Sequence, residues 1–185
     1  MTTIAGIQGI DFAVLVADSQ ITEDNLVTLA TSTPKIIATG KFLIAISGDT
    51  RPGDILSYNW KAPIYKGEDP VQFMGKKVIP SIINAFNDNG YEYNKVDKEG
   101  GFDYLVAFNG NIFRIACDLS FFSSNRDIYA IGSGSQFALG YLFSICKPDM
   151  ELAYASKHAR KAVEIASVLD ANTGKPLQFA VQERG

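Results

Sequence analysis

The second residue of the chain, Thr2, could combine a nucleophile and a base in one amino acid. Removal of Met1 ahead of this small residue would leave Thr2 with a free α-amine beside its hydroxyl. The amine of a chain terminus has a reference pKa of about 7.7–8.0, so part of it is unprotonated at neutral pH. A threonine hydroxyl activated by its own amine is a recognised covalent nucleophile. The sequence therefore raises the hypothesis that Thr2 is a nucleophile, if other residues build a site around it.

Two charged residues lie at the ends of short apolar runs. Asp18 ends one such run, and Lys35 opens another. A carboxylate in this position is most often a turn former, and a lysine at a strand start is most often a solvated edge residue. In the functional alternative, Asp18 pairs with Lys35, and Lys35 points at Thr2. Its charge would then lower the pKa of the Thr2 hydroxyl and favour the neutral amine, and both effects promote attack.

Three loops carry further residues that could serve such a site. Gly48 stands between a strand and a helix, and its exposed N–H could hold a developing oxyanion because the missing Cβ lets a substrate approach. Ser133, in a glycine-rich turn before a helix, could hydrogen-bond the Thr2 amine. Residues 170–174 follow the last long helix. Each of these segments, taken alone, is also an ordinary turn or helix cap.

Composition excludes several classes of protein. The chain has 185 residues, 46 % of them hydrophobic, which fits a single domain over residues 1–185. Its 17 Lys and Arg against 20 Asp and Glu include no basic block, so no nucleic-acid partner is expected. With no apolar run of about 18 residues and no charged secretory start, we expect no membrane association and a cytoplasmic protein. Two cysteines and one histidine show no metal-like spacing, so neither a metal nor a cofactor is expected.

Strand and helix patterns alternate in blocks along the chain. Short runs rich in Ile and Val, bounded by Gly or Asp, predict strands at residues 3–7, 12–17, 35–39, 42–47, 104–108, 112–116, 127–131 and 178–182. Apolar residues at three- and four-residue steps predict a helix from Pro70 onward, with a kink at Pro80. Helical patterns also predict helices at 136–145 and 151–169, and a short helix is expected at 54–60, where the pattern is less regular. Tight turns between neighbouring strands make the pairing mostly antiparallel. Two such sheets stacked face to face, with helices over both outer faces, are one layout that buries these surfaces.

The order and spacing of the candidate residues resemble a known family. The segments that carry the resemblance are Thr2-Thr3-Ile4, Ala17-Asp18-Ser19, Lys35, Gly48, Gly132-Ser133-Gly134 and Asp170 with Thr173-Gly174. Together they look like the catalytic β-subunits of proteasomes and the bacterial HslV-type proteases, which are N-terminal-nucleophile (Ntn) hydrolases. The resemblance covers nearly the whole chain. It implies an α+β fold, the four-layer αββα sandwich of two stacked, mainly antiparallel sheets, with the site at one end of the sheets.

The resemblance also implies a role for each matching residue. Thr2 would hydrolyse peptide bonds through an acyl-enzyme, as in a threonine peptidase. Lys35 would tune this nucleophile, Asp18 would hold Lys35 in place, and the Gly48 N–H would stabilise the oxyanion. Lys35 lies one residue farther from Asp18 than in most relatives, with Pro34 in the strict register.

Four more residues take implied roles around the nucleophile. Ser133 and the pair Asp170 and Thr173 would position the N-terminal amine. Ile46 falls where the family lines its main specificity pocket, so an apolar substrate residue is expected there. Asp49 follows Gly48 where relatives usually carry a small neutral residue, and its charge could repel acidic substrates or slow catalysis.

The family suggests partners and leaves alternatives open. It implies a peptide or unfolded protein as substrate, a homo-oligomeric ring and an ATP-dependent unfoldase partner, and removal of Met1 alone would expose Thr2. A second reading is a small-molecule amidase or acylase with the same nucleophile. A third is a catalytically silent ring or scaffold subunit, which Asp49 and the shifted register of Lys35 keep open.

Overall fold

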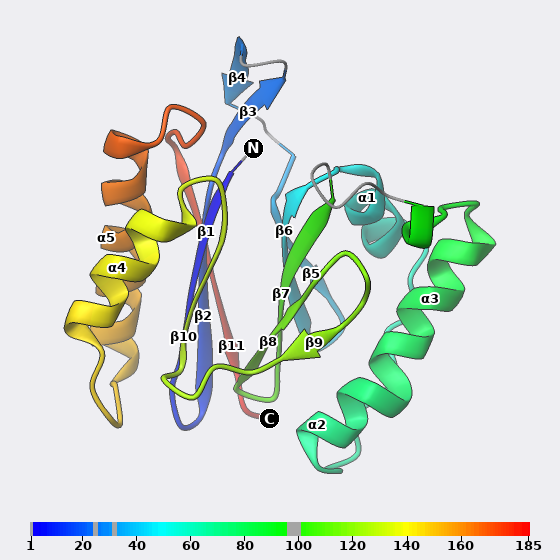
Figure 1. Ribbon diagram of the computed structural model, residues 1–185. Coiled ribbons are helices and arrows are strands. Elements are labelled where there is room, and N and C mark those ends of the chain that lie inside the picture. Colours follow the sequence, from blue (N-terminus) through cyan, green and yellow to red (C-terminus); the bar gives the residue numbers. More distant parts are fainter. Residues whose placement is uncertain (1, 24–25, 31–32, 96–100) are drawn as a thin grey trace.

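Two antiparallel β-sheets lie face to face at the centre of the molecule, and helices cover the outer face of each (Figure 1). The computed structural model describes residues 2–23, 26–30, 33–95 and 101–185. The first sheet, in spatial order, contains β10 (Ile128–Gly132), β1 (Thr3–Gln8), β2 (Phe12–Asp18) and β11 (Leu177–Glu183). The second contains β5 (Ile36–Thr39), β6 (Phe42–Gly48), β7 (Phe102–Phe108), β8 (Asn111–Ile115) and β9 (Phe121–Phe122). This arrangement confirms the predicted α+β sandwich.

The helices form the two outer layers of the sandwich. The first sheet is covered by α4 (Ser135–Ile145) and α5 (Leu152–Leu169), and the second by α1 (Arg51–Tyr58), α2 (Pro70–Phe73), the π-helical turn η1 (Met74–Val78) and α3 (Ile79–Asp88). A short 3₁₀ turn, η2 (Tyr93–Lys95), follows α3. Within the described ranges, no helix combines the length and the apolar character that crossing a membrane requires.

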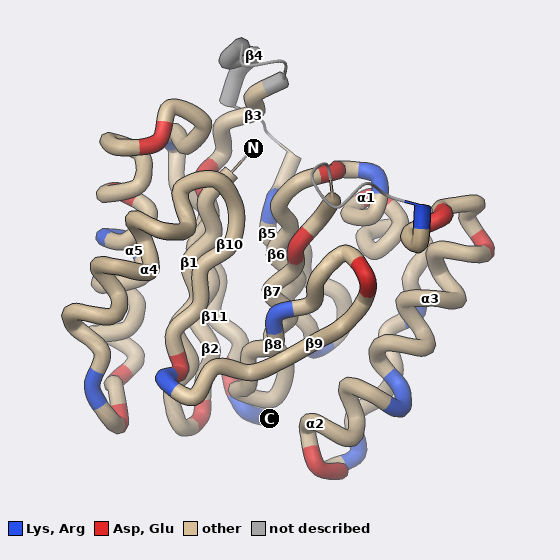
Figure 2. Tube along the Cα trace, viewed as in Figure 1, with Lys and Arg blue, Asp and Glu red and all other residues tan. Residues whose placement is uncertain are grey.

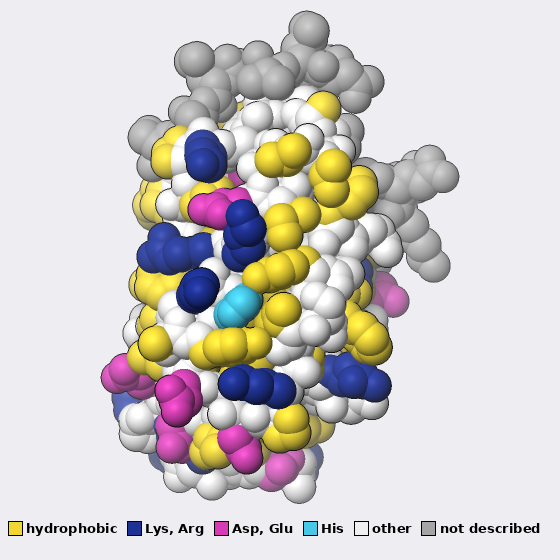
Figure 3. All heavy atoms as spheres, turned by 90° about the vertical axis from the view of Figure 1, so that its left-hand side faces the viewer, with side chains coloured by type: hydrophobic (Ala, Val, Ile, Leu, Met, Phe, Trp, Pro, Cys, Tyr) yellow, Lys and Arg dark blue, Asp and Glu magenta, His cyan; other side chains and the backbone are white. Residues whose placement is uncertain are grey.

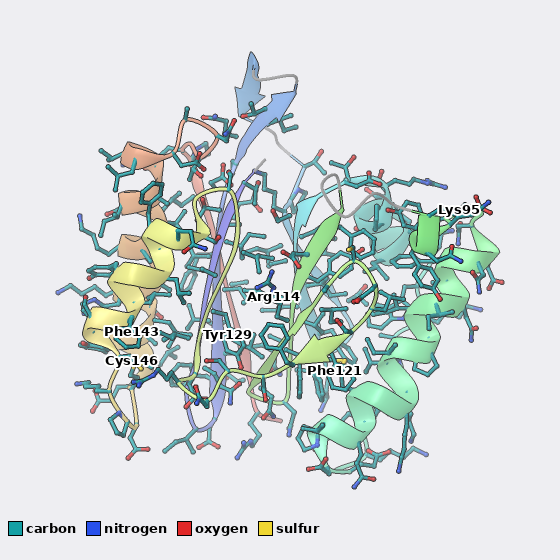
Figure 4. All side chains as sticks on the ribbon, viewed as in Figure 1. Lys95, Arg114, Phe121, Tyr129, Phe143 and Cys146 are labelled. Carbon is teal, nitrogen blue, oxygen red and sulfur yellow. The ribbon has the colours of Figure 1, made fainter. Side chains whose placement is uncertain are left out.

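Three hydrophobic layers hold the sheets and helices together. Between the sheets lie mainly small and aliphatic residues, together with Tyr129, whose hydroxyl donates to the Ile112 carbonyl oxygen at 2.8 Å (Figure 4). The layer under α5 is rich in alanine, at Ala155, Ala159, Ala162 and Ala166. The layer under α1 and α3 is aromatic, with Phe42, Trp60, Phe73, Phe86, Phe102, Phe108 and Phe113. Small side chains let α5 lie close to β1 and β2, whereas large rings fill the wider space on the other side.

Besides the short elements β9 and η2, which no sequence pattern predicts, the structure differs from the sequence-based prediction in three places. The helix expected at 54–60 begins earlier, at Arg51. Where Pro80 was expected to kink a helix, it lies in the first turn of α3, directly after η1. Helical bonding continues from η1 into α3, because the Ile79 N–H donates to the Met74 carbonyl oxygen five residues earlier. The π-helical turn thus directly precedes Pro80, which has no N–H to donate to an α-helical acceptor. The third difference is a hairpin, β3 (Gln20–Glu23) and β4 (Leu26–Ala30), which forms a separate small sheet.

The sandwich has two distinct ends. The first described residue lies near β3 and the end of β6, while the C-terminus lies at the opposite end (Figure 1). Charged residues gather at the ends of the strands, in the loops and on the outer helices (Figure 2). The end near β3 holds the candidate residues of the site.

Candidate active site

Thr2 lies directly before β1 and is buried, with 3 % of its surface exposed. The neighbouring strand approaches it closely, because Thr3 pairs with Gly132 across β1 and β10. A Cβ on Gly132 would lie 2.0 Å from the Thr2 carbonyl oxygen, and the φ of +91° at Gly132 also favours glycine. Gly132 therefore allows β10 to enclose the first residue of the site. The sequence singled out this turn, but not this role.

Lys35 reaches Thr2 from the start of β5, in the opposite sheet. Its ammonium group donates hydrogen bonds to Thr2 Oγ1, to Asp18 Oδ1 at 2.9 Å and to the Gln20 carbonyl oxygen at 2.6 Å. The side chain of Lys35 is 13 % exposed and that of Asp18 is fully buried. Burial lowers the pKa of Lys35, and the charge and hydrogen bond of Asp18 oppose this only in part. The structure thus brings Thr2, Asp18 and Lys35 to one point.

Asp18 is held in place by backbone groups as well as by Lys35. Its Oδ1 accepts from the N–H of Thr3 at 3.0 Å, and its Oδ2 accepts from the N–H groups of Gln20 at 3.0 Å and Gly174 at 3.1 Å. A buried carboxylate needs such donors, because an uncompensated charge in the interior costs several kcal/mol. Since these donors belong to the backbone, the fold itself fixes the partner of Lys35.

A second polar group connects the loop after α5 to the start of β1. Thr173 Oγ1 donates to Asp170 Oδ2 at 2.6 Å and lies 2.5 Å from Thr3 Oγ1. Ser133 Oγ donates to the same Asp170 oxygen at 2.7 Å and lies 3.3 Å from the Thr2 carbonyl oxygen. These contacts reach the first strand through the Thr2 carbonyl and the Thr3 hydroxyl. They bring Ser133, Asp170 and Thr173 together beside Thr2.

The ionisation of Asp170 follows from its hydrogen bonds. Burial raises the pKa of Asp170, but the bonds donated by Thr173, Ser133 and Asn172 outweigh burial, so the pKa is lowered overall. Asp170 is therefore an ionised acceptor at neutral pH. Gly134, in the turn that carries Ser133, keeps this group compact: a Cβ there would lie 2.2 Å from Thr3 Oγ1.

Gly48 ends β6 in a conformation that suits glycine. Its φ is +97°, and a Cβ at this position would lie 2.1 Å from the Gly101 carbonyl oxygen. The preceding residue, Ser47, has its Oγ 2.9 Å from the point where a Cβ of Gly132 would stand. The end of β6 therefore faces the turn that encloses Thr2, and Gly48 lies at the same end of the sandwich as Lys35.

The chain is similar to proteasome subunits in sequence and in fold. The family model for the proteasome subunit matches residues 105–182. A proteasome subunit beta of Nanoarchaeum equitans (strain Kin4-M) is 27 % identical over 195 residues, which cover 100 % of this chain and 95 % of the relative. The resemblance to the proteasome β-subunit and HslV-type family is confirmed.

Solved structures of low sequence identity share the proteasome-type fold. BPH of Thiobacillus denitrificans, in a complex with epoxomicin, matches with a TM-score of 0.78 at 22 % identity and covers 99 % of both chains. The eukaryotic HslV from Trypanosoma brucei matches with a TM-score of 0.69 at 22 % identity, over 98 % of this chain and 99 % of that one. These matches confirm the sandwich of two stacked, mainly antiparallel sheets with helices outside.

In this proteasome-type fold, Ile46 and Asp49, two residues before Gly48 and one after it, face α1. The Ile46 side chain lies against Gly53, where a Cβ would be 2.7 Å from Ile46 Cδ1. Asp49 Oδ2 accepts a hydrogen bond from the Tyr91 hydroxyl at 2.9 Å, and its Oδ1 accepts from the N–H of Arg51 at 3.0 Å. Burial and then the contact with Asp49 raise the pKa of Tyr91, so the phenol stays a donor. Both oxygens of Asp49 thus have partners within the fold.

Some residues of the site carry no signal in the sequence. No sequence pattern marks the Thr3 hydroxyl as part of the site, nor Gln178, whose side chain contacts the backbone of Lys35. A buried threonine or a glutamine in a strand looks like many others, so only the assembled fold identifies them. Among the described residues, no three His, Cys, Asp or Glu side chains gather in a way that could hold a metal ion.

Proposed function

We propose that this chain is a threonine peptidase of the proteasome type, with Thr2 as its N-terminal nucleophile. The observation that carries the proposal is the hydrogen bond from the Lys35 ammonium to Thr2 Oγ1. Lys35 is itself paired with the buried Asp18. A nearby positive charge stabilises the ionised hydroxyl and disfavours the protonated amine, so one lysine activates both groups of Thr2.

The reaction starts once Thr2 is the first residue of the mature chain, as after removal of Met1. Its amine accepts the hydroxyl proton while Oγ1 attacks the carbonyl carbon of the peptide bond. The Gly48 N–H stabilises the negative charge that develops on the carbonyl oxygen. The amine then returns the proton to the departing nitrogen, which leaves an ester on Thr2. Water, activated by the same amine, hydrolyses this ester and restores the enzyme.

The remaining residues of the site act by positioning. Ser133, Asp170 and Thr173 hold the first residues of β1 through the Thr2 carbonyl and the Thr3 hydroxyl. Holding the nucleophile in place raises the rate of the reaction, because a displacement of about 1 Å can cost roughly 100-fold in rate. In the proposal Ile46 lines an apolar specificity pocket.

The effect of the Asp49 charge on a bound substrate depends on the hydrogen bonds that its carboxylate accepts. Both carboxylate oxygens have hydrogen-bond partners, at the Tyr91 hydroxyl and at the start of α1. These partners lessen the repulsion of an oxyanion bound at the neighbouring Gly48, which favours an active subunit over a silent one. A residual preference against acidic substrates is expected.

Replacement of the nucleophile tests the proposal. Thr2→Ala is expected to abolish hydrolysis of fluorogenic peptides while circular dichroism and the melting temperature stay close to those of the parent protein. Thr2→Ser keeps both the hydroxyl and the amine, so it is expected to retain activity. A Thr2→Ala protein with unchanged turnover would place the chemistry elsewhere. Acylated small amines, assayed beside the peptides, separate a peptidase from an amidase.

We further propose that the chain works in a homo-oligomeric ring. Three large apolar side chains on α4 are exposed: Phe137 by 42 %, Leu139 by 39 % and Phe143 by 58 %. Figure 3 shows the α4–α5 face, where hydrophobic side chains lie beside Lys, Arg and the single His, and Figure 4 labels Phe143. Exposed apolar groups of this size favour association. Light scattering should give an oligomer, and Phe143→Asp should reduce its mass.

We also propose that the ring works with an ATP-dependent unfoldase. The chain alone is expected to cleave peptides and unfolded protein. Cleavage of a stably folded protein is expected only when such an unfoldase and ATP are added.

A further inference from the structure

At the site, a side chain of one edge strand contacts the backbone beside the edge strand of the other sheet. β11 is the last strand of the first sheet and β5 the first strand of the second. Gln178, on β11, reaches across to the backbone at the start of β5. Its Oε1 accepts from the N–H of Lys35 at 2.7 Å and from the N–H of Ile36 at 3.3 Å. The side chain that contacts Thr2 is therefore anchored through its own backbone.

The other half of the Gln178 amide is also engaged. Its Nε2 donates to Ser19 Oγ at 3.0 Å, and the Ser19 N–H donates to the Gly174 carbonyl oxygen at 3.1 Å. Ser19 is buried, with 2 % of its surface exposed. Two backbone donors require an oxygen on one side of the amide, so the orientation of the Gln178 side chain is determined.

Pro34 explains why Lys35 needs this anchor. A proline has no N–H, so the first backbone donors after it are those of Lys35 and Ile36. Both donors use Gln178 Oε1. On its other side Lys35 is held by its carbonyl oxygen, which accepts from the Ile46 N–H of β6 at 3.1 Å. Contacts from both sheets thus fix the backbone of Lys35. They do so although Lys35 lies one residue farther along the chain from Asp18 than in most proteins of the resembling family.

We propose that Gln178 is a positioning residue for peptide hydrolysis, which holds the Lys35 backbone so that its ammonium group reaches Thr2 Oγ1. This inference rests on the proposed function. Gln178 touches neither Thr2 nor Asp18 in the contacts described above, so it acts through Lys35. Its loss should change the rate of the chemical step more than the binding of substrate.

The same strand provides a matched control at the other end of the sandwich. Gln182 lies four residues farther along β11, so it is on the same face as Gln178. Its Oε1 accepts from the N–H of Gly110, in the turn between β7 and β8, at 2.6 Å. Gln182 therefore also links the two sheets, but away from Lys35. Replacing Gln182 therefore removes a similar hydrogen bond between the sheets without changing the contacts of Lys35.

The experiment compares Gln178→Met with Gln182→Met in hydrolysis of a fluorogenic peptide. Methionine keeps the length of the side chain and removes its hydrogen bonds. We expect Gln178→Met to lower kcat about 10- to 100-fold with KM within about twofold of the parent value. Gln182→Met should keep both constants within about twofold, although it lowers the melting temperature by a similar amount. Gln178→Glu, which keeps an acceptor for the Lys35 N–H, should recover most of the lost rate.

Equal kcat values for Gln178→Met and Gln182→Met would overturn the inference, as would a Gln178→Glu protein no better than Gln178→Met. If Gln178→Met does not fold, Gln178→Asn serves instead, because its shorter side chain cannot span to Lys35. It should lower kcat to a similar extent, and parent-like kcat would overturn the inference. Thr2→Ala in the same assay separates the two claims: activity in that variant contradicts the proposed function, whereas its inactivity leaves the test of Gln178 intact.

Discussion

At both ends of the sandwich a glutamine side chain links the two sheets, but the ion pairs at the two ends differ in their exposure to solvent. At each end a glutamine of β11 links the two sheets, Gln178 at the site and Gln182 at the far end. At the far end the ion pair between Arg184 and Asp11 is exposed, by 47 % and 71 %. At the site the pair between Lys35 and Asp18 is 13 % and 0 % exposed.

Neither ion pair is explained by a large contribution to stability. An exposed ion pair contributes about 0–1 kcal/mol and needs little support. A buried pair gains little over apolar residues of the same size, because both charges have to be desolvated. A buried pair that also bonds a threonine hydroxyl therefore indicates that the charges serve chemistry.

The largest expected effect comes from removing one acidic partner at each end. Asp18→Ala leaves the buried Lys35 charge without its partner, so we expect a loss of about 3–5 kcal/mol in the free energy of unfolding, together with loss of activity. Asp11→Ala, at the exposed pair, should cost less than about 1 kcal/mol and keep full activity. Urea denaturation measures both. Similar losses in the two variants would remove the distinction between the ends.

Removal of the site lysine separates activity from stability. Lys35→Met should lower peptide hydrolysis by about 100- to 1000-fold, as expected for loss of a charged group that stabilises the reacting atoms. The free energy of unfolding should fall less than in Asp18→Ala, because three backbone N–H groups still bond Asp18. The control is Lys41→Met, in the exposed turn between β5 and β6, which should behave as the parent protein. A Lys35→Met protein within tenfold of the parent rate would contradict this role.

A smaller effect is expected in the dependence of the rate on pH, which reports the ionisation of the buried Lys35. The rate should rise on the acid side as the Thr2 amine loses its proton, and fall on the alkaline side as Lys35 loses its own. Because burial lowers the pKa of Lys35, the alkaline decline should be centred below its ordinary value of 10.5. In Lys35→Arg, whose charge persists at all working pH values, the residual activity should show no such decline. The ratio kcat/KM measured against pH checks this, and an unchanged decline in the arginine variant would count against it.

Much of the fold followed from sequence patterns, because apolar periodicity and glycine-bounded turns are local signals. Thr2, Asp18 and Lys35 were found from their order along the chain, although what makes them neighbours is the pairing of β1 with β2 and the stacking of two sheets. Gln178 could not be found in this way. It lies 143 residues from Lys35, and its contact depends on two edge strands meeting.

The elements that sequence reasoning missed also have physical reasons. The strand β3 reads Gln-Ile-Thr-Glu, with too few apolar residues to mark a strand buried on one face. The turn η1 depends on how the chain accommodates Pro80, which no propensity scale describes.

The role of Thr2 is tested most directly by mapping where an electrophilic peptide attaches to the mature protein. If Thr2 is the nucleophile, the intact mass begins at Thr2, and tandem mass spectrometry assigns a single adduct to that residue. Labelling should be lost in Lys35→Met and kept in Lys41→Met. Active protein that retains Met1, or an adduct on any other residue with Thr2 unmodified, would contradict the claim that Thr2 is the nucleophile.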